Sequence, residues 1–174
     1  GLVWDTPELA AQVMNDYRRY VEYAKGDAKP QVTILFGTMY GNTEKMARMA
    51  KAYLEEHGVP VVMLNVSETD LGTVLMHTLE SKGLVVGAPT YEYKMFPPMA
   101  STLDEMGRKM ITHRKAVYFG SYGWSGEGVK LISEHLKACG FELVNDGIRA
   151  LWNPDEAARS EGEKFGAAFA RAVK

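Results

Sequence analysis

The spacing of apolar residues changes repeatedly along the chain, from short continuous runs to positions three or four residues apart. Short apolar runs bounded by turn residues predict buried strands, whereas apolar residues at helical spacing predict amphipathic helices. The predicted strands, five in number, lie within residues 32–36, 59–66, 84–87, 116–119 and 141–151. The helix expected after each strand has its apolar stripe within residues 46–54, 71–79, 99–110, 129–136 or 158–169. This alternation favours parallel pairing through right-handed crossovers, and hence an α/β fold with a doubly wound, five-stranded parallel sheet.

Capping residues indicate where the last of these helices begins. The segment Asn153-Pro154-Asp155-Glu156 is typical of a capping box with proline at the first helical position. The residues expected on the buried face of this helix are Ala158, Gly162, Phe165 and Phe169.

An extra helix is predicted before the first strand. Thr6, Pro7 and Glu8 suit its start, and a short polar link follows it at residues 26–30. Its apolar stripe consists of Leu9, Val13, Tyr17, Tyr20, Val21 and Ala24. We therefore expect an N-terminal helix and linker over residues 1–30, packed on the sheet or on a partner, and one domain over residues 31–174.

Composition and charge then exclude several classes of protein. The chain has 174 residues, 20 Lys and Arg against 22 Asp and Glu, and a net charge of −2, which disfavours a nucleic-acid-binding surface. Its apolar runs are too short to cross a bilayer, so no membrane association is expected. A single cysteine, Cys139, fits a reducing compartment and predicts a cytoplasmic protein. The four histidines are scattered, so no metal site is expected.

The loop after the first predicted strand has the character of a phosphate site. It reads Thr38-Met39-Tyr40-Gly41-Asn42-Thr43 and opens directly into a helix, whose N-terminus favours an anion. The loop lacks lysine and arginine, and neither GxxxxGK[ST] nor GxGxxG spacing is present. We therefore expect a phosphate monoester that is held and not transferred. The alternative is an ordinary strand–turn–helix junction with Thr43 as the N-cap.

The loop after the third predicted strand is rich in aromatic residues. It contains Pro89, Thr90, Tyr91, Glu92, Tyr93 and Phe96. Aromatic side chains that gather in a surface loop indicate a bound partner, so we expect them to border one face of a planar ring. The alternative is that Phe96 packs only against the following helix while the tyrosines are half-exposed.

The loop after the fourth predicted strand combines glycines with two large rings. It reads Gly120-Ser121-Tyr122-Gly123-Trp124-Ser125-Gly126-Glu127-Gly128. Glycines allow the backbone to approach a ligand closely, while Tyr122 and Trp124 offer flat surfaces and Ser125 is expected to cap the next helix. The alternatives are a flexible loop with a surface tryptophan, or a protein-binding patch.

All three loops are expected to meet, because ligands of open α/β sheets bind beyond the carboxyl ends of the strands. A phosphate cradle with two aromatic loops describes a mononucleotide that carries a large planar ring, namely FMN. The expected FMN-binding residues are Thr38, Met39, Tyr40, Gly41, Asn42, Thr43, Pro89, Thr90, Tyr91, Glu92, Tyr93, Phe96, Ser121, Tyr122, Gly123, Trp124, Gly126 and Gly128. No Ser/His/Asp grouping falls in these loops, so we expect no catalytic residue and leave the electron chemistry to the flavin.

These loops resemble those of flavodoxins, and more closely those of the flavodoxin module of flavodiiron proteins. The first loop is similar to the TMYGxT form of that module, and residues 87–90 with 96–98 are similar to its second loop. The third resemblance, over residues 119–127, is the most specific, and Gly1-Leu2-Val3-Trp4 is similar to the sequence that follows the diiron domain. The resemblance implies the strand order 2-1-3-4-5. Two departures are Glu92-Tyr93, where the family often carries asparagine, and Gly37, where it is often polar.

The resemblance also implies a function. The module would take electrons from a rubredoxin or a flavin reductase and pass them to a diiron centre that reduces O₂ or NO. That centre would lie on a metallo-β-lactamase-like domain outside this chain, in a homodimer or tetramer, so this chain would be the electron-transfer module of an oxidoreductase. The alternatives are a free-standing flavodoxin or a flavodoxin-like NAD(P)H:quinone oxidoreductase. A signalling receiver domain is disfavoured, because Gly37-Thr38 and Ala88-Pro89 stand where its acidic residues belong.

Overall fold

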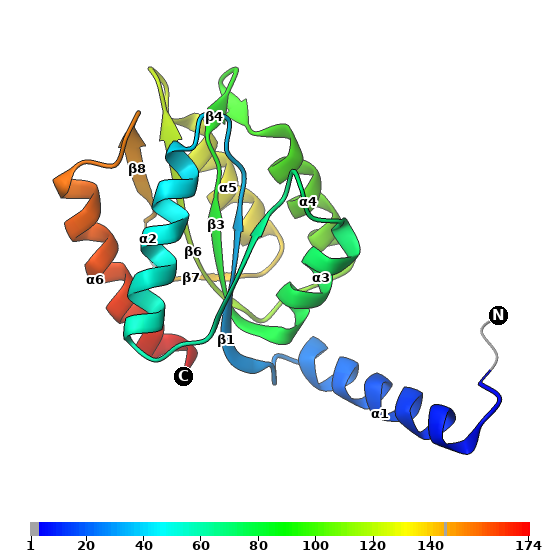
Figure 1. The fold of residues 1–174 in the computed structure, drawn as a ribbon. Coiled ribbons are helices and arrows are strands. Elements are labelled where there is room, and N and C mark those ends of the chain that lie inside the picture. Colours follow the sequence, from blue (N-terminus) through cyan, green and yellow to red (C-terminus); the bar gives the residue numbers. More distant parts are fainter. Residues whose placement is uncertain (1–3, 145) are drawn as a thin grey trace.

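A parallel sheet forms the middle layer of the protein (Figure 1), in a computed structural model that describes residues 4–144 and 146–174. Its strands follow one another across the sheet in the order β2 (Val61–Asn65), β1 (Lys29–Phe36), β3 (Ser81–Gly87), β6 (Lys115–Tyr122) and β7 (Glu142–Leu143). A further strand, β8 (Ile148–Leu151), also pairs with β6, and all these pairs are parallel. The predicted fold class and the strand order 2-1-3-4-5 are therefore confirmed, with β7 and β8 sharing the fifth position.

The last predicted strand, within residues 141–151, is two strands in the structure. β7 pairs with the beginning of β6, where Ala116 lies opposite Leu143, and β8 pairs with its end, where Tyr122 lies opposite Leu151. Gly147 stands between them at a φ of +78°, and a Cβ atom there would lie 2.3 Å from a ring carbon of Tyr118. The chain thus bends tightly over the Tyr118 ring at this point, which interrupts the pairing.

Helices cover both faces of the sheet. One face carries α2 (Asn42–Glu56) and α6 (Glu156–Val173), and the other carries α3 (Leu71–Glu80), α4 (Pro97–Arg108) and α5 (Glu127–Ala138). Neighbouring residues of β3 face opposite layers, since Val85 packs with the first group and Val86 with the second. Burial on both faces explains why the strands are continuous apolar runs in the sequence. None of the helices among the described residues is long and apolar enough to cross a membrane.

The predicted start of the last helix is wrong by two positions. Asp155 is the N-cap of α6, and its carboxylate accepts a hydrogen bond of 2.8 Å from the backbone N–H of Ala158. Pro154 therefore precedes the cap, and the first helical residue is Glu156. The buried residues of α6 are Ala158, Gly166, Phe169, Ala170 and Val173, while Gly162 and Phe165 are only half-buried.

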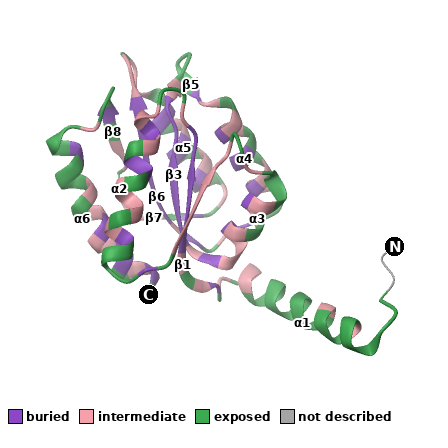
Figure 2. Cartoon of the chain, in the orientation of Figure 1, coloured by how far each residue is buried: buried purple, intermediate pink, exposed green. Residues whose placement is uncertain are grey.

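The extra N-terminal helix is confirmed as α1 (Pro7–Ala24), capped by Thr6, whose hydroxyl accepts a hydrogen bond from Leu9 N–H. Its position differs from one expectation, because none of its residues is buried in the described part of the chain. Figures 1 and 2 show α1 extending away from the rest of the molecule, with an exposed surface along its length. The expectation that α1 packs on the sheet is therefore wrong for this chain.

Arg114 fastens the last turn of α1 to the domain. Its guanidinium donates to the carbonyl oxygens of Tyr23 at 2.6 Å and Leu79 at 2.5 Å, joining the C-terminal ends of α1 and α3. The side chain is 2% exposed, and this burial lowers the pKa of Arg114. Backbone carbonyls at helix C-termini offset part of the cost of burying its charge.

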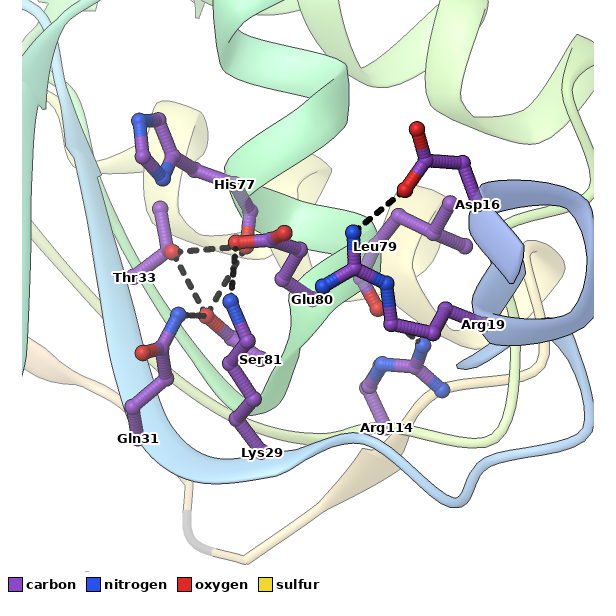
Figure 3. A network of polar contacts seen from close by, with 10 residues as sticks. All are labelled: Asp16, Arg19, Lys29, Gln31, Thr33, His77, Leu79, Glu80, Ser81 and Arg114. Atoms are coloured by element: carbon purple, nitrogen blue, oxygen red, sulfur yellow. Dashed lines mark hydrogen bonds and ion pairs between the residues drawn. The ribbon is translucent and has the colours of Figure 1, made fainter. Parts of the chain in front are cut away.

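A polar network next to Arg114 ties α3 to the central strands (Figure 3). The Thr33 hydroxyl lies 3.0 Å from the His77 carbonyl oxygen and 2.8 Å from the Ser81 hydroxyl, and all of Thr33 is buried. Gln31 donates to Ser81, and Lys29 forms an ion pair of 2.8 Å with Glu80. These polar contacts stabilise the edge of the sheet at which β1 and β3 begin. The loops that carry the candidate chemistry lie at the opposite edge, where the strands end.

Candidate functional site

A cleft of about 430 Å³ opens at the carboxyl edge of the sheet. Its lining comes from loops that follow β1, β3, β6 and β8. These residues are Thr38, Met39, Tyr40, Asn42, Thr43, Pro89, Thr90, Tyr91, Glu92, Tyr93, Ser121, Tyr122, Gly123, Trp124, Ser125 and Trp152. The three loops singled out in the sequence therefore converge on one cleft, and a fourth joins them.

The first loop leaves the N-terminus of α2 open. Gly41 is the N-cap with a φ of +81°, and within the described chain no side chain caps the helix there. The Thr38 hydroxyl accepts a hydrogen bond of 3.0 Å from Gly41 N–H, which holds the loop in its turn. An uncapped first turn offers its N–H groups and the positive end of its dipole to an anion.

Thr43 is buried and is not the N-cap, so the alternative that assigned it that role is wrong. Its hydroxyl lies 2.9 Å from the hydroxyl of Ser121 at the end of β6. This contact joins the first loop to the third across the floor of the cleft.

The second loop is a small hairpin that the sequence did not predict. Its strands are β4 (Thr90–Tyr91) and β5 (Lys94–Met95), and the two residues between them have positive φ values, 46° at Glu92 and 61° at Tyr93. Two successive positive φ values are typical of a type I′ turn, which usually contains Asn-Gly. Because Glu-Tyr lacks this signature, nothing in the local sequence predicted the hairpin. Both residues contribute to the cleft lining.

Thr90 links the second loop to the third. Its hydroxyl accepts a hydrogen bond of 3.1 Å from Gly128 N–H, and a Cβ atom at Gly128 would lie 2.8 Å from that hydroxyl oxygen. Gly128 is therefore required for close approach of the two loops, which gives it a structural role at the border of the cleft.

Phe96 lies outside the cleft lining. A Cβ atom built on Gly37 would come 2.4 Å from its ring, and the ring packs against the core beneath α4. Gly41, Gly126 and Gly128 are also absent from the lining, although each belongs to one of the converging loops. Fourteen of the eighteen predicted residues line the cleft, and these four lie beside it.

The third loop places aromatic side chains at the rim. Trp124 is 78% exposed, while Tyr40 on the first loop is 82% exposed. Ser125 was expected to cap the next helix, but the N-cap is Gly126. The Ser125 hydroxyl instead hydrogen-bonds to the Glu127 carboxylate and lowers the pKa of Glu127.

Trp152 is the functional candidate that sequence reasoning missed. It follows β8 and contributes to the lining from a fourth loop. The available signal was its place directly after the last predicted strand, since carboxyl ends of parallel strands share one edge.

The cleft fits FMN in size and in the kinds of residue that line it. Its volume lies in the range of small-molecule sites, its walls are aromatic, and its base holds an uncapped helix N-terminus. Of the described residues that line it, Glu92 is the one with a charged side chain at neutral pH. A neutral cradle of hydroxyl, amide and backbone N–H groups suits a phosphate monoester that is held in place.

Comparison with known proteins decides the family. The sequence profile described as Flavodoxin matches residues 34–166. The chain belongs to the flavodoxin family. FMN is the cofactor that this membership implies, in agreement with the sequence prediction and with the fit of the cleft.

Individual relatives of this flavodoxin-family chain are larger proteins. The anaerobic nitric oxide reductase flavorubredoxin of Aeromonas hydrophila is 32% identical over 173 residues, which cover 98% of this chain and 34% of that protein. The solved structure of rubredoxin oxygen:oxidoreductase from Desulfovibrio gigas has a TM-score of 0.87 and 27% identity, over 94% of this chain and 41% of that one.

The flavodiiron protein of Giardia intestinalis shares the fold, with a TM-score of 0.83 and 24% identity over 99% of this chain and 43% of its own. The resemblance to the flavodoxin-like part of flavodiiron proteins is thus confirmed. This flavodoxin-family chain spans about a third of the length of the curated relatives it matches. Among residues 4–144 and 146–174, no group of three or more His, Cys, Asp or Glu side chains could hold a metal ion.

Proposed function

We propose that this chain is the FMN-binding electron-transfer domain of a flavodiiron-type oxidoreductase. It would relay electrons from a redox partner to a diiron centre on a part of the protein that is not in this chain. The observation that carries the proposal is the cleft itself, which combines an uncapped helix N-terminus with aromatic walls. The extensive match to a third of a flavorubredoxin supports the same assignment.

The chain's own residues would hold and shield the cofactor. The first-turn N–H groups of α2, with the side chains of Thr38 and Asn42, would bind the phosphate. Tyr91 and Tyr93 would border the flavin ring from one side, and Tyr122 and Trp124 from the other. The other predicted residues of the three loops keep their proposed binding role, either in the lining or beside it. Bound FMN supplies the electron-carrying ring, and the protein supplies orientation and electrostatics.

The diiron part of the same protein is the proposed partner of α1. The exposed apolar residues of this helix are Leu9, Met14, Tyr17, Tyr20 and Val21. A continuous apolar stripe that the domain leaves uncovered favours a protein contact. We accordingly keep residues 1–30 as the connection and residues 31–174 as the flavin domain. A rubredoxin or flavin reductase as donor, a homodimer or tetramer as the assembly, and a cytoplasmic location stay predictions.

The second candidate is a free-standing flavodoxin. It is favoured by the fold, because the loops after β1, β3, β6 and β8 of one domain converge on the cleft. The uncovered stripe on α1 favours the module instead, because a free-standing carrier gains nothing from it.

The test of the cofactor site is FMN binding by the purified chain. We expect a yellow protein that releases FMN, and an apo form whose FMN affinity falls with Trp124→Ala by about 1–3 kcal/mol, judged from aromatic burial. Trp4→Ala is the matched control, since Trp4 is also exposed but lies outside the cleft lining. A colourless chain that fails to bind added FMN would contradict the proposal.

The proposed electron relay is tested by adding the diiron part to the reduced flavin domain. With the flavin reduced in the absence of O₂, addition of NO should leave it reduced unless the diiron part of the same protein is also present. Equal reoxidation with and without that part would favour the free-standing carrier.

A further inference from the structure

The loop after β8 is bonded to the end of β6 and contributes to the cleft lining. Trp152 N–H donates a hydrogen bond of 2.9 Å to the carbonyl oxygen of Tyr122, directly beyond the point where Tyr122 pairs with Leu151. The ladder between β6 and β8 is thereby extended by one residue. This places Trp152 at the same edge as the three cleft loops, where its side chain becomes part of the lining.

Trp152 adopts an unfavourable backbone conformation. Its φ is +59°, in the left-handed region that a bulky side chain rarely enters. Non-glycine residues in this conformation persist where the surrounding structure holds them, and they cluster at ligand sites.

Core packing does not explain this tryptophan, because 56% of it is exposed. Its ring lies on Gly123, where an added Cβ atom would come within 3.2 Å of the indole. The protein thus holds a large ring in a strained position at the mouth of a cleft, with one side against the third loop and much of its surface uncovered.

The next residue ties the same loop to the phosphate cradle. The Asn153 side-chain oxygen accepts a hydrogen bond of 2.8 Å from the Lys45 ammonium group, which also lies 3.5 Å from the side-chain oxygen of Asn42 in the first turn of α2. The fourth loop therefore contacts the third loop through Trp152 and the N-terminal end of α2 through Asn153.

We propose that Trp152 is a further FMN-binding residue, which closes the fourth side of the cleft and holds the third loop in place. This inference rests on the proposed FMN site and extends it to a loop outside the three that carry the family resemblance. The indole covers part of the bound flavin, so the surface now exposed becomes buried on binding, and Gly123 keeps the ring close to the third loop. The aromatic contact compensates for the left-handed backbone at Trp152.

The test is titration of the apo protein with FMN, followed by flavin fluorescence, with visible circular dichroism of the bound flavin as a second readout. Trp152→Ala and Trp152→Gly should each raise the dissociation constant about tenfold, the scale of one aromatic contact, and should change the circular dichroism band. Trp152→Phe should recover most of the affinity. Leu151→Ala is the matched control, because this neighbour is 54% exposed and does not line the cleft.

The glycine variant separates the ring from the backbone. Glycine adopts a positive φ freely, so a role limited to the turn predicts wild-type affinity for Trp152→Gly, and that result would overturn the proposal. Wild-type affinity with an unchanged flavin band in Trp152→Ala would overturn it as well. Thermal unfolding of each apo variant checks that the domain is folded.

A second variant perturbs the contact between Trp152 and Gly123 without removing the tryptophan. Gly123→Ala places a methyl group 3.2 Å from the indole, so the ring must shift by a few tenths of an ångström, and FMN binding should weaken modestly in the folded protein. Unchanged affinity in this variant would count against the proposal. Failure of the wild-type chain to bind FMN would instead overturn the proposed function on which this inference rests, whereas normal binding by all Trp152 variants would overturn the inference alone.

Discussion

α1 and α6 are both 18 residues long, and both begin at a side-chain N-cap. Their environments differ completely, since five residues of α6 are buried and none of α1 is buried within the described chain. The contact under α6 is close, because a Cβ atom at Gly83 would lie 2.6 Å from Val173 and 2.9 Å from Phe169. The comparison teaches that an apolar stripe predicts a helix with a face to cover, but does not say whether the same domain covers it.

Among the substitutions that test this comparison, Phe169→Ala on α6 should lower the free energy of unfolding the most. The side chain is 1% exposed, and its loss leaves a cavity between α6 and β3, so the free energy of unfolding should fall by about 3–5 kcal/mol. Urea denaturation followed by circular dichroism measures the change. Phe165→Ala, on the same helix but half-buried, is the control and should cost distinctly less. Equal losses at the two positions would contradict the packing described for α6.

Arg114→Met should have the next largest effect, because Arg114 is the link between α1 and the domain. The substitution keeps the length of the side chain but removes the guanidinium donor from the half-buried carbonyl groups of Tyr23 and Leu79, of which Tyr23 keeps a hydrogen bond from Gly26 N–H, at a cost of about 1–3 kcal/mol. We also expect faster proteolysis between α1 and β1. Lys115→Met is the control, since Lys115 has only a loose surface contact of 3.8 Å with Glu142. Unchanged stability and proteolysis would show that α1 is held by other contacts.

Substitutions at the two N-caps test the same comparison, with smaller expected changes in stability. Asp155→Ala removes the 2.8 Å cap of α6 and should lower the global free energy of unfolding by about 1 kcal/mol. Thr6→Ala removes the cap of α1, which should increase amide hydrogen exchange in the first turn of α1 without changing the global transition. A global loss from Thr6→Ala would mean that α1 unfolds together with the domain.

The smallest effect is expected from the stripe on α1. The double variant Tyr17→Ser and Val21→Ser changes exposed residues, so the stability of this chain should change by less than about 0.5 kcal/mol. If the proposed function is right, the same variant should weaken association with the diiron part, measured by calorimetry. Arg18→Ser together with Glu22→Ser, exposed residues of the same helix, is the matched control.

The layers of the fold were predictable because both faces of the inner strands β1, β3 and β6 are buried. Val85 and Val86 face opposite helical layers, so the run to which they belong is continuous and easily recognised. The division of the last strand was not predictable, because the bend at Gly147 depends on the ring of Tyr118, which lies on another strand.

The site was predictable where the loop chemistry is local. Thr38 and Asn42 precede or begin a helix in the sequence itself, so an anion cradle follows from elementary electrostatics. The inward packing of Phe96 depends on the space left by Gly37, and the place of Trp152 depends on the pairing of β8 with β6. Both are tertiary contacts between distant segments, which local spacing does not encode.

The position of β1 between β2 and β3 has a consequence for how the chain folds. Val32 pairs with Val61 on one side and with Gly83 on the other. All pairs of strands in this sheet are parallel, so none of them is a hairpin closed by a short turn. Every pairing must wait for a long loop to close, which makes the nucleus non-local and folding slow for a domain of this size. A ribosome would have to expose the chain beyond β3 before β1 gained both partners. The loops that form the cleft should accordingly become ordered late, after the strands that support them have paired.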